Sequence, residues 1–423
     1  MNHYQVIIVG GGQAGLSVSY CLKKENINHL ILDRGQIGDS WAKRRWDSFC
    51  LVTPNWQCRL PGFDYNGNDP KGFMLKDEIV DYVKRYASSF NPPYKGGVEV
   101  FKVYKKEAEV IFSIETSIGN FTATKVIIAA GAYHIPNVLS ISKGFDNDIN
   151  QIHSVDYKNP EQLTEGATLV IGSGQSGAQI AEDLHIAGKE VYLSVGTAPR
   201  APRTYRGKDA VEWLEDMGYY DQPIESHPDP EEARHKTNHY LTGRDGGRDI
   251  DLRKLAIEGI QLRGQLSHVE NGIINFNNDL KENLDAADAT YTRIQKNIDA
   301  YIDNNNIKAP APTRYEPLWE PNTENKQHID YKKEGIKNII WCTGFRVDYN
   351  WIEFPHIYDQ KGFPMYKRGI TEEPGLYFIG LPWLHTWGSG RFSHVGQDAI
   401  YISNHIIDEF ENELMVTCLT KNS

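Results

Sequence analysis

The chain has 423 residues, a hydrophobic fraction of 40% and a formal net charge of −11. This length allows two or three domains, each able to bury its own core. The acidic balance argues against a nucleic-acid partner, because phosphate binding requires a concentrated surface of lysine and arginine. No apolar stretch reaches membrane-spanning length, and a β-type run begins close to Met1, which leaves no room for a secretion signal.

The cysteines form no C-x-x-C pair and no zinc-ligand spacing, and their number is odd: Cys21, Cys50, Cys58, Cys342 and Cys418. We therefore expect reduced thiols in a cytoplasmic protein. The spacing of His235 and His239 would suit a metal on a helix, but Lys236 stands where a zinc protease has glutamate. The sequence thus predicts no metal site.

A first strand–turn–helix–strand segment begins at residue 5. An apolar run over residues 5–9 leads into a glycine-rich turn, a helical pattern and a second apolar run over residues 29–33. The turn contains Gly10, Gly12, Gln13, Ala14 and Gly15 in G-x-G-x-x-G spacing, which lets backbone N–H groups approach a pyrophosphate. Asp33 ends the second strand, where a carboxylate can accept hydrogen bonds from an adenosine ribose.

Further β-type runs follow this segment. Residues 109–116 and 119–123 predict a hairpin, and residues 125–131 predict a separate buried strand that ends at Ala130 and Gly131.

A second segment with the same pattern starts at residue 167. The run over residues 167–171 precedes a turn that contains Gly172, Gly174, Gln175, Ser176 and Gly177, a helical stretch and a strand over residues 190–194. That strand ends at Ser194 without an acidic residue, and Arg200, Arg203 and Arg206 follow. Arginines at this point can bind a 2′-phosphate, which favours NADPH over NADH. An ordinary solvated run of charge is the alternative.

The rest of the chain alternates polar and apolar stretches. Residues 221–247 are polar, and a later helix places Tyr291, Ile294, Ile298, Tyr301 and Ile302 on one face, a pattern that core packing explains most simply. Residues 338–344 and 375–380 read as strands, and residues 395–407 as a helix with Ser393 as its N-cap.

The two repeated segments predict an α/β protein with two Rossmann-like dinucleotide-binding domains, the second inserted into the first, and a helical, polar insertion. We place the first part of the first domain at residues 1–150. The second domain with its insertion then occupies residues 151–330, and residues 331–423 complete the first domain.

Beyond the glycine turns, the chain resembles the flavin-containing monooxygenase-like group of two-dinucleotide flavoproteins over nearly its whole length. The resemblance is carried by residues 38–41 (GDSW), 45–48 (RWDS), 53–56 (TPNW), 60–62 (LPG), 129–131 (AAG) and 342–344 (CTG). It implies FAD on the first turn and NADPH on the second. Residues 13–17, 52–58 and 72–74 further resemble a flavin-dependent oxidoreductase encoded beside a nitrilase in bacterial gene clusters.

The monooxygenase fingerprint of this group is F-x-G-x-x-x-H-x-x-x-(W/Y/F). Only His153 and Tyr157 match it here, because Asn147 and Ile149 stand at the Phe and Gly positions. The fingerprint is associated with holding NADP beside an oxygenated flavin. The departure therefore keeps open an NADPH–flavin dehydrogenase or electron-transfer oxidoreductase that inserts no oxygen.

The resemblance implies a monooxygenase that reduces FAD with NADPH and inserts one oxygen atom of O2 into a small organic substrate through a C4a-(hydro)peroxyflavin. It implies catalytic roles for Asn55, His153 and Tyr157, and a helix N-terminus after Ser393 directed at the flavin. The expected cofactor-binding residues are Gly10, Gly12, Gln13, Ala14, Gly15, Asp33, Arg34, Trp41, Arg45, Asn55, Ala130, Gly131, Gly172, Gly174, Gln175, Ser176, Gly177, Ser194, Arg200, Arg203, Gly344, Gly380 and His394.

Other functions fit the sequence less well. A pyridine-nucleotide disulfide reductase shares the two-dinucleotide plan but needs a thiol pair near the flavin, and Cys50 and Cys58 are too widely spaced. A redox-sensing flavoprotein would not need both phosphate-binding turns. We expect a small-molecule substrate and O2 as partners, with no nucleic acid and no membrane; the sequence leaves open a homo-oligomer and the roles of His385 and Arg391.

Overall fold

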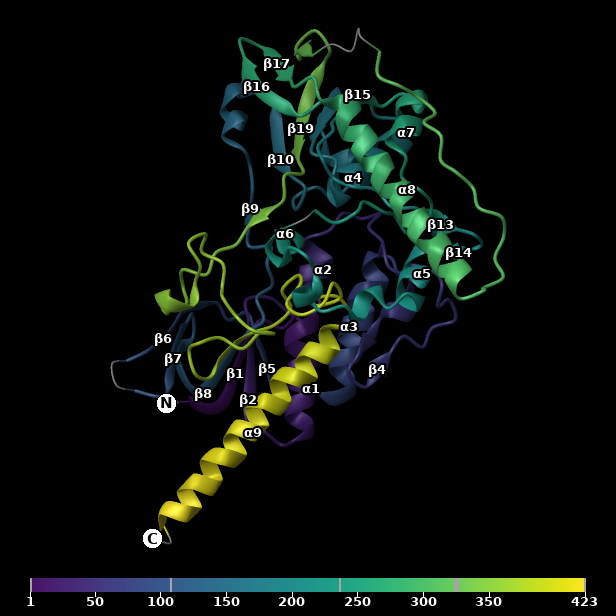
Figure 1. The fold of residues 1–423 in the computed structure, drawn as a ribbon. Coiled ribbons are helices and arrows are strands. Elements are labelled where there is room, and N and C mark those ends of the chain that lie inside the picture. Colours follow the sequence, from purple (N-terminus) through teal and green to yellow (C-terminus); the bar gives the residue numbers. More distant parts are fainter. Residues whose placement is uncertain (1, 107–108, 236, 323–326, 422–423) are drawn as a thin grey trace.

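The computed structural model of the protein describes residues 2–106, 109–235, 237–322 and 327–421 (Figure 1). Two halves, each built on a largely parallel sheet, lie one above the other in this view. None of the described helices is both long and apolar enough to cross a membrane.

The first sheet has the strand order β5-β2-β1-β8-β7-β6, with β21 also paired to β8. Its strands are β1 (Asn2–Val9), β2 (His29–Asp33), β5 (Tyr94–Gly96), β6 (Val100–Lys105), β7 (Phe112–Thr116), β8 (Gly119–Ile128) and β21 (Leu376–Phe378). The helices α1 (Gln13–Lys24), α3 (Lys76–Phe90) and the first turns of α9 (Val395–Lys421) share one core with it, and the far end of α9 projects from the body (Figure 1).

The second sheet is wholly parallel, with the order β10-β19-β11-β12-β15. Its strands are β10 (Asn150–His153), β11 (Ala167–Ile171), β12 (Val191–Ser194), β15 (Gln261–Arg263) and β19 (Ile336–Trp341). The helices α4 (Gln175–Ile186), α7 (Leu252–Glu258) and α8 (Leu280–Asn304) belong to this half. A smaller antiparallel sheet of β16 (Leu266–Glu270), β17 (Ile273–Phe276) and β18 (His328–Asp330) shares a core with it.

Short elements connect these layers and form the insertion. They are α2 (Asp39–Lys43), β3 (Arg59–Leu60), β4 (Phe63–Asp64), β9 (Ile135–Pro136), β13 (Thr204–Tyr205), β14 (Lys208–Asp209), α5 (Ala210–Asp216), α6 (Pro230–His235) and β20 (Phe345–Arg346). Single 3-10 turns are η1 (Asn55–Gln57), η2 (Ser140–Gly144), η3 (Pro160–Gln162), η4 (Tyr219–Asp221), η5 (Ile224–Ser226), η6 (Arg244–Gly246) and η7 (Pro355–Ile357).

The predicted α/β fold with two Rossmann-like units is confirmed. The chain returns from the second half to the first later than residue 331, where the sequence predicts it. Both β18 and β19 belong to the second half, because β19 pairs with β10 on one side and β11 on the other. The chain leaves and re-enters the first half through β9 and β20, which pair antiparallel with each other.

Two elements are longer than predicted. The hairpin strand and the separate buried strand predicted near residue 125 form one continuous strand, β8. Its first part pairs with β7, and residues 121–128 pair with β1. The last helix continues to Lys421 rather than ending near residue 407. The helix predicted near residue 298 is α8, and Ile298 and Ile302 pack in a buried cluster with Trp213, as core packing predicts.

Candidate functional site

The first glycine turn joins β1 to α1 at the carboxyl end of the parallel strands. Gly10 has φ +110°, and a Cβ on Gly15 would lie 1.9 Å from the Gly10 carbonyl oxygen, so a side chain at Gly15 would push α1 away from the turn. Within the described part of the chain, nothing lies within 4 Å of where a Cβ of Gly12 would stand. The turn therefore has the open approach that a pyrophosphate needs.

Asp33 follows this turn at the end of β2. Its carboxylate accepts hydrogen bonds from the N–H groups of Gly11 at 2.5 Å and Gly35 at 2.7 Å, and Arg34 beside it is exposed. The Tyr94 hydroxyl donates to the Gly35 carbonyl at 3.0 Å. The carboxylate is thus fixed beside the turn, where it can accept further bonds from ribose hydroxyls.

Three side chains in or near the loop before α9 have buried polar atoms with no hydrogen-bond partner among the described residues. The Trp41 ring stacks on Phe392 at 5.4 Å, and its Nε1 is buried with no hydrogen-bond partner. Gln57 is 1% exposed, and neither its amide oxygen nor its amide nitrogen has a partner. His394 is 3% exposed; its Nε2 lies 3.4 Å from Oδ1 of Asp221, whereas its Nδ1 has no partner among the described residues. Buried groups of this kind are normally satisfied, so the region fits a polar planar ligand such as a flavin.

Other predicted flavin residues lie around the same loop. Gln13 donates from Nε2 to the Gly390 carbonyl at 2.9 Å, which ties the first turn to the loop. The Arg45 guanidinium lies 5.1 Å over the Trp41 ring. Gly380 has φ +78°, and a Cβ there would lie 2.6 Å from Ala14 Cβ. These residues therefore converge on one region from four different segments.

Asn55 is buried in that region but both ends of its amide are already engaged. Its Nδ2 donates to the Asp69 carbonyl at 2.9 Å, and its Oδ1 accepts from the Met74 N–H at 2.7 Å. These bonds fold the loop between β3, β4 and α3. The sequence did not single out Gln57, two residues further on, whose buried amide has no hydrogen-bond partner among the described residues.

At the end of β8, Ala130 is exposed, and Gly131 has φ +74° with open space around it. His134 and the Tyr349 hydroxyl both donate to the Gly131 carbonyl, at 2.9 Å and 3.0 Å. The strand end next to the flavin region is thus held from two sides.

The second glycine turn repeats the first. Gly172 has φ +99°, and a Cβ on Gly177 would lie 1.7 Å from the Gly172 carbonyl oxygen. Gln175 pairs with the backbone of Leu241, donating from Nε2 and accepting at Oε1, while Ser176 is half-buried. Near Gly174 the only atom within 4 Å of a Cβ would be the Thr237 methyl, at 3.7 Å, among the residues described. The insertion therefore borders this turn without filling it.

The residues predicted to choose between NADPH and NADH are all engaged within the protein. The Ser194 hydroxyl donates to the Gly264 carbonyl at 3.0 Å. Arg200 is buried between Asp251 at 3.1 Å and Asp288 at 3.2 Å. Arg203 is buried against Asp209 at 2.6 Å and donates to the Val52 carbonyl at 2.7 Å. Carboxylates already neutralise both arginines, so their role toward a 2′-phosphate stays a prediction.

His153 stands at the crossover between the two halves. Its Nε2 donates to the Gly344 carbonyl at 3.0 Å, and its Nδ1 accepts from the Val155 N–H at 3.2 Å. Burial lowers the pKa of His153 below the ordinary value for histidine, which favours this neutral arrangement. The fingerprint departures also have a structural setting, because Ile149 is buried with Phe145 and Asn147 is exposed.

Tyr157 has no exposed surface and lies between the two halves. Its hydroxyl donates to Asp183 of α4 at 2.7 Å. The same carboxylate accepts bonds from Ser48 of the first half at 2.6 Å and from Arg244 of the insertion at 2.8 Å. The structure therefore places Tyr157 in a buried network that joins three segments, away from open space.

Burial makes the described thiols poor nucleophiles. It raises the pKa of Cys21 to about 11 and that of Cys58 to about 12, and it also raises the pKa values of Cys50 and Cys342. The side chains of His235, Lys236 and Cys418 lie outside the described part. Within the described part, no group of three or more His, Cys, Asp or Glu side chains could hold a metal ion.

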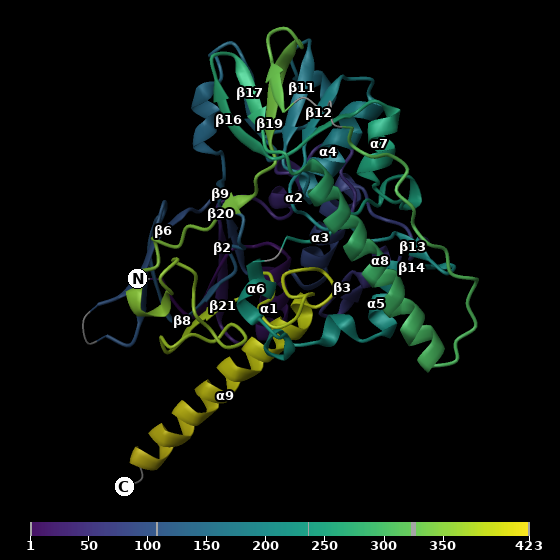
Figure 2. The same cartoon turned by 45° about the horizontal axis from the view of Figure 1, so that its top comes forward.

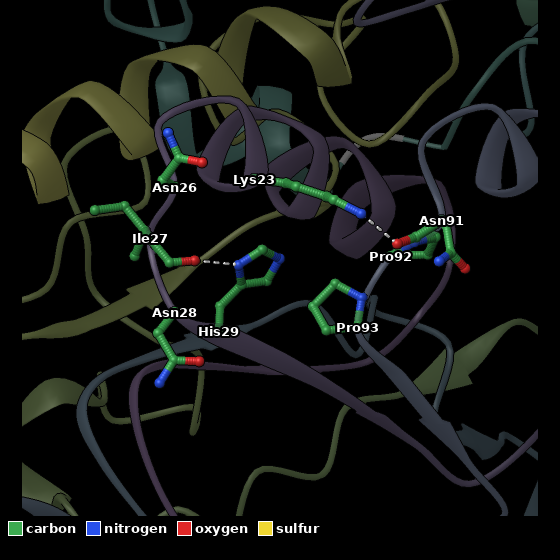
Figure 3. A pocket seen from close by; sticks show the side chains of 8 residues that line it. All are labelled: Lys23, Asn26, Ile27, Asn28, His29, Asn91, Pro92 and Pro93. Carbon is green, nitrogen blue, oxygen red and sulfur yellow. Dashed lines mark hydrogen bonds between the residues drawn. The ribbon is translucent and has the colours of Figure 1, made fainter.

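An open pocket of about 400 Å³ lies at the opposite end of the first sheet (Figure 3). Lys23 crosses it and donates to the carbonyls of Phe90 and Asn91, both at 2.7 Å, and His29 Nδ1 bonds to the Ile27 carbonyl. Dinucleotides bind outside the carboxyl ends of parallel strands, whereas His29 begins β2. This pocket is therefore separate from the cofactor region.

Two sheets, each with a glycine turn at the carboxyl end of its parallel strands, define a two-dinucleotide oxidoreductase. Residues 7–217 match the family described as pyridine nucleotide-disulphide oxidoreductase. A CzcO-like oxidoreductase of Geobacillus kaustophilus is 33% identical over 406 residues, which are 95% of this chain and 98% of that protein. The chain therefore belongs to the CzcO-like oxidoreductases, within the flavin-containing monooxygenase-like flavoproteins.

Solved structures show how widely this fold is shared. A flavin monooxygenase from Stenotrophomonas maltophilia, carrying two substitutions, aligns with a TM-score of 0.64 at 17% identity over 96% of this chain and 98% of that chain. A bacillithiol disulfide reductase from Bacillus cereus aligns with a TM-score of 0.62 at 14% identity over 96% of this chain and 100% of that chain. Because oxygenases and reductases share the fold, the site itself must decide the function.

Proposed function

We propose that the protein reduces bound FAD with NADPH and then transfers one oxygen atom of O2 to a small organic substrate. The observation that carries this proposal is the group of buried, unpartnered polar atoms of Trp41, Gln57 and His394 near the loop that Gln13 ties to the first glycine turn. When bound, the flavin supplies both hydride acceptance and the reaction with O2. The protein supplies binding, orientation and exclusion of water.

Each half contributes defined groups to this task. The first turn and Asp33 would hold the FAD pyrophosphate and ribose, and Trp41 and Gln57 would donate to the edge of the flavin ring. The second turn would hold the NADPH pyrophosphate in the same way. The absence of an acidic residue at Ser194 removes the repulsion that a 2′-phosphate would meet there, which supports NADPH over NADH.

His153 and Tyr157 fit positioning roles. His153 fixes the Gly344 carbonyl at the crossover, and Tyr157 ties the second half to Asp183 and Ser48. Catalysis between two bound cofactors depends on their relative placement to within about 1 Å. These two residues would therefore set the distance from the nicotinamide to the flavin without contacting either.

Disulfide reduction is disfavoured by the state of the thiols. A reductase needs a thiolate next to the flavin, whereas burial raises the pKa values of Cys50 and Cys58, and the two lie on separate segments that form no disulfide. The remaining alternative is a dehydrogenase that passes electrons onward without inserting oxygen.

A stopped-flow experiment separates oxygenation from simple dehydrogenation. The NADPH-reduced holoprotein is mixed with O2, and O2 consumption is compared with the release of hydrogen peroxide. A monooxygenase consumes O2 first and releases peroxide only after a delay when no substrate is present. Simultaneous consumption and release, with one peroxide per NADPH, would establish the dehydrogenase. Failure of the purified protein to bind FAD would overturn both.

A further inference from the structure

Arg391 lies in the loop before α9, where the insertion packs against that loop. Figures 1 and 2 show this yellow loop beside α6, and the Ile224 N–H donates to the His385 carbonyl at 2.6 Å. The Arg391 guanidinium donates to the Trp387 carbonyl and, at 3.0 Å, to Oδ1 of Asn238. It also lies 3.8 Å over the Trp387 ring. The group is thus held in one place by neutral partners.

Six arginines between residues 200 and 253 are neutralised by carboxylates. Each of the following lies within 4.0 Å of an aspartate or glutamate: Arg200, Arg203, Arg206, Arg244, Arg248 and Arg253. Arg391 has no such partner among the residues that the structure describes. No carboxylate of the described residues therefore compensates its charge.

The surroundings of Arg391 are aromatic. Tyr220 packs on Trp387 at 4.7 Å, and Tyr219 lies edge-on to Tyr220 at 5.5 Å. Burial lowers the pKa of Arg391, and the nearby hydroxyls of Tyr133, Tyr220 and Tyr219 only partly oppose that effect. An uncompensated cation in such a setting is unfavourable until an anion pairs with it. Arg391 itself remains half-exposed, so an anion can reach it.

The position of Arg391 places such an anion next to the flavin region. Phe392, the next residue, stacks on Trp41, and Gly390, the preceding residue, accepts the bond from Gln13. On the other side, Asn238 belongs to the segment that pairs with the second turn through Leu241. The guanidinium therefore lies between the two cofactor turns, where a substrate must lie to meet the flavin.

We propose that Arg391, held by Asn238 and Trp387, binds the carboxylate group of an organic substrate, with Tyr219 and Tyr220 covering its apolar part. This inference rests on the proposed function, because it places the substrate beside the flavin. Two of the five guanidinium N–H donors are engaged by protein oxygens, which leaves donors for a carboxylate. The diphosphate of NADPH has its own open N–H groups at the second turn. The aromatic rings beside Arg391 match an organic acid better than a diphosphate.

Spectral titration of the oxidised holoprotein tests the proposal without turnover. Phenylacetate and its neutral analogue phenylacetamide are added separately, and binding is followed by the change in flavin absorbance. We expect saturable binding of phenylacetate that is at least about tenfold tighter than that of the amide. The variant Arg391→Gln should lose at least about tenfold in phenylacetate affinity, and Arg391→Lys should lose less.

The control variant is Arg234→Gln, because Arg234 lies on α6 and pairs with Glu231 at 2.8 Å. It should leave the titration unchanged. Equal binding of acid and amide, no binding of either, or full phenylacetate affinity in Arg391→Gln would overturn the proposal. If Arg391→Gln loses affinity for NADP+ but keeps its affinity for phenylacetate, Arg391 binds the cofactor diphosphate instead. Bound FAD and reduction by NADPH, measured on the unaltered protein, show separately whether the proposed function holds.

Discussion

Replacement of Tyr157 by phenylalanine would show whether this residue positions the two halves or takes part in the chemistry. The change removes one of three hydrogen bonds to the buried Asp183 carboxylate and leaves those from Ser48 and Arg244. A hydrogen bond to a charged group contributes about 1.5–3 kcal/mol to stability. For a half of roughly 200 residues, this corresponds to a fall in Tm of about 3–12 °C.

The assay combines thermal unfolding with the rate of flavin reduction by NADPH. Because Tyr157 has no exposed surface, and because Ser48 and Arg244 still tie Asp183 to the first half and to the insertion, we expect Tyr157→Phe to change that rate by less than about threefold well below Tm. Tyr301→Phe is the matched control, since among the described residues its hydroxyl bonds only to the Asp216 carbonyl at 2.9 Å and should contribute under about 1.5 kcal/mol. An unchanged Tm together with a reduction rate lowered by about 100-fold would refute the positioning role.

Three further outcomes follow from the site. Gly177→Ala should keep FAD but weaken NADPH binding at least about tenfold, because the added Cβ would lie 1.7 Å from the Gly172 carbonyl oxygen. An unchanged NADPH affinity, measured from the rate of rapid flavin reduction at several NADPH concentrations, would contradict this. Arg200→Ala should lower the free energy of unfolding, measured in denaturant, by about 3–5 kcal/mol, because two buried aspartates lose their partner. It should alter the KM values for NADPH and NADH equally. A selective rise in the KM for NADPH would establish the 2′-phosphate role. Burial lowers the pKa values of His134 and His153, so the unfolded chain binds more protons, and the free energy of unfolding should fall as the pH drops below about 6.5; a His153→Gln variant with an equally steep pH profile of Tm would remove His153 as a cause.

The parts of the fold that the sequence predicts are those governed by local pattern. Both glycine turns depend on positive φ and on close packing of a helix against its own strand, within fewer than ten residues. Asp33 is likewise fixed by its place at the end of β2. The second half extends past the predicted boundary at residue 331, because β19, the strand that completes the second sheet, follows β11 by more than 150 residues.

The roles of individual side chains depend on partners distant in sequence. Arg200 is neutralised by Asp288, and Tyr157 reaches Asp183, so neither environment can be read from the local pattern. Gln57 gave only a faint signal, a polar residue in the apolar sequence Trp56-Gln57-Cys58. Its importance comes from complete burial without a partner, which only the three-dimensional structure reveals.

At both crossovers between the halves, a histidine bonds to the carbonyl of a glycine that follows a central strand. Gly131 follows β8, and its carbonyl accepts a hydrogen bond from His134, which in turn accepts one from the Asp348 N–H. Gly344 follows β19, and its carbonyl accepts a hydrogen bond from His153, which in turn accepts one from the Val155 N–H. Each neutral imidazole thus fixes the glycine that follows a central strand of one sheet. Because β9 and β20 pair between these points, a shift of either glycine would change how the second half sits on the first. The departure from the monooxygenase fingerprint at Asn147 and Ile149 therefore leaves intact His153, which holds the Gly344 carbonyl at the crossover between the two halves.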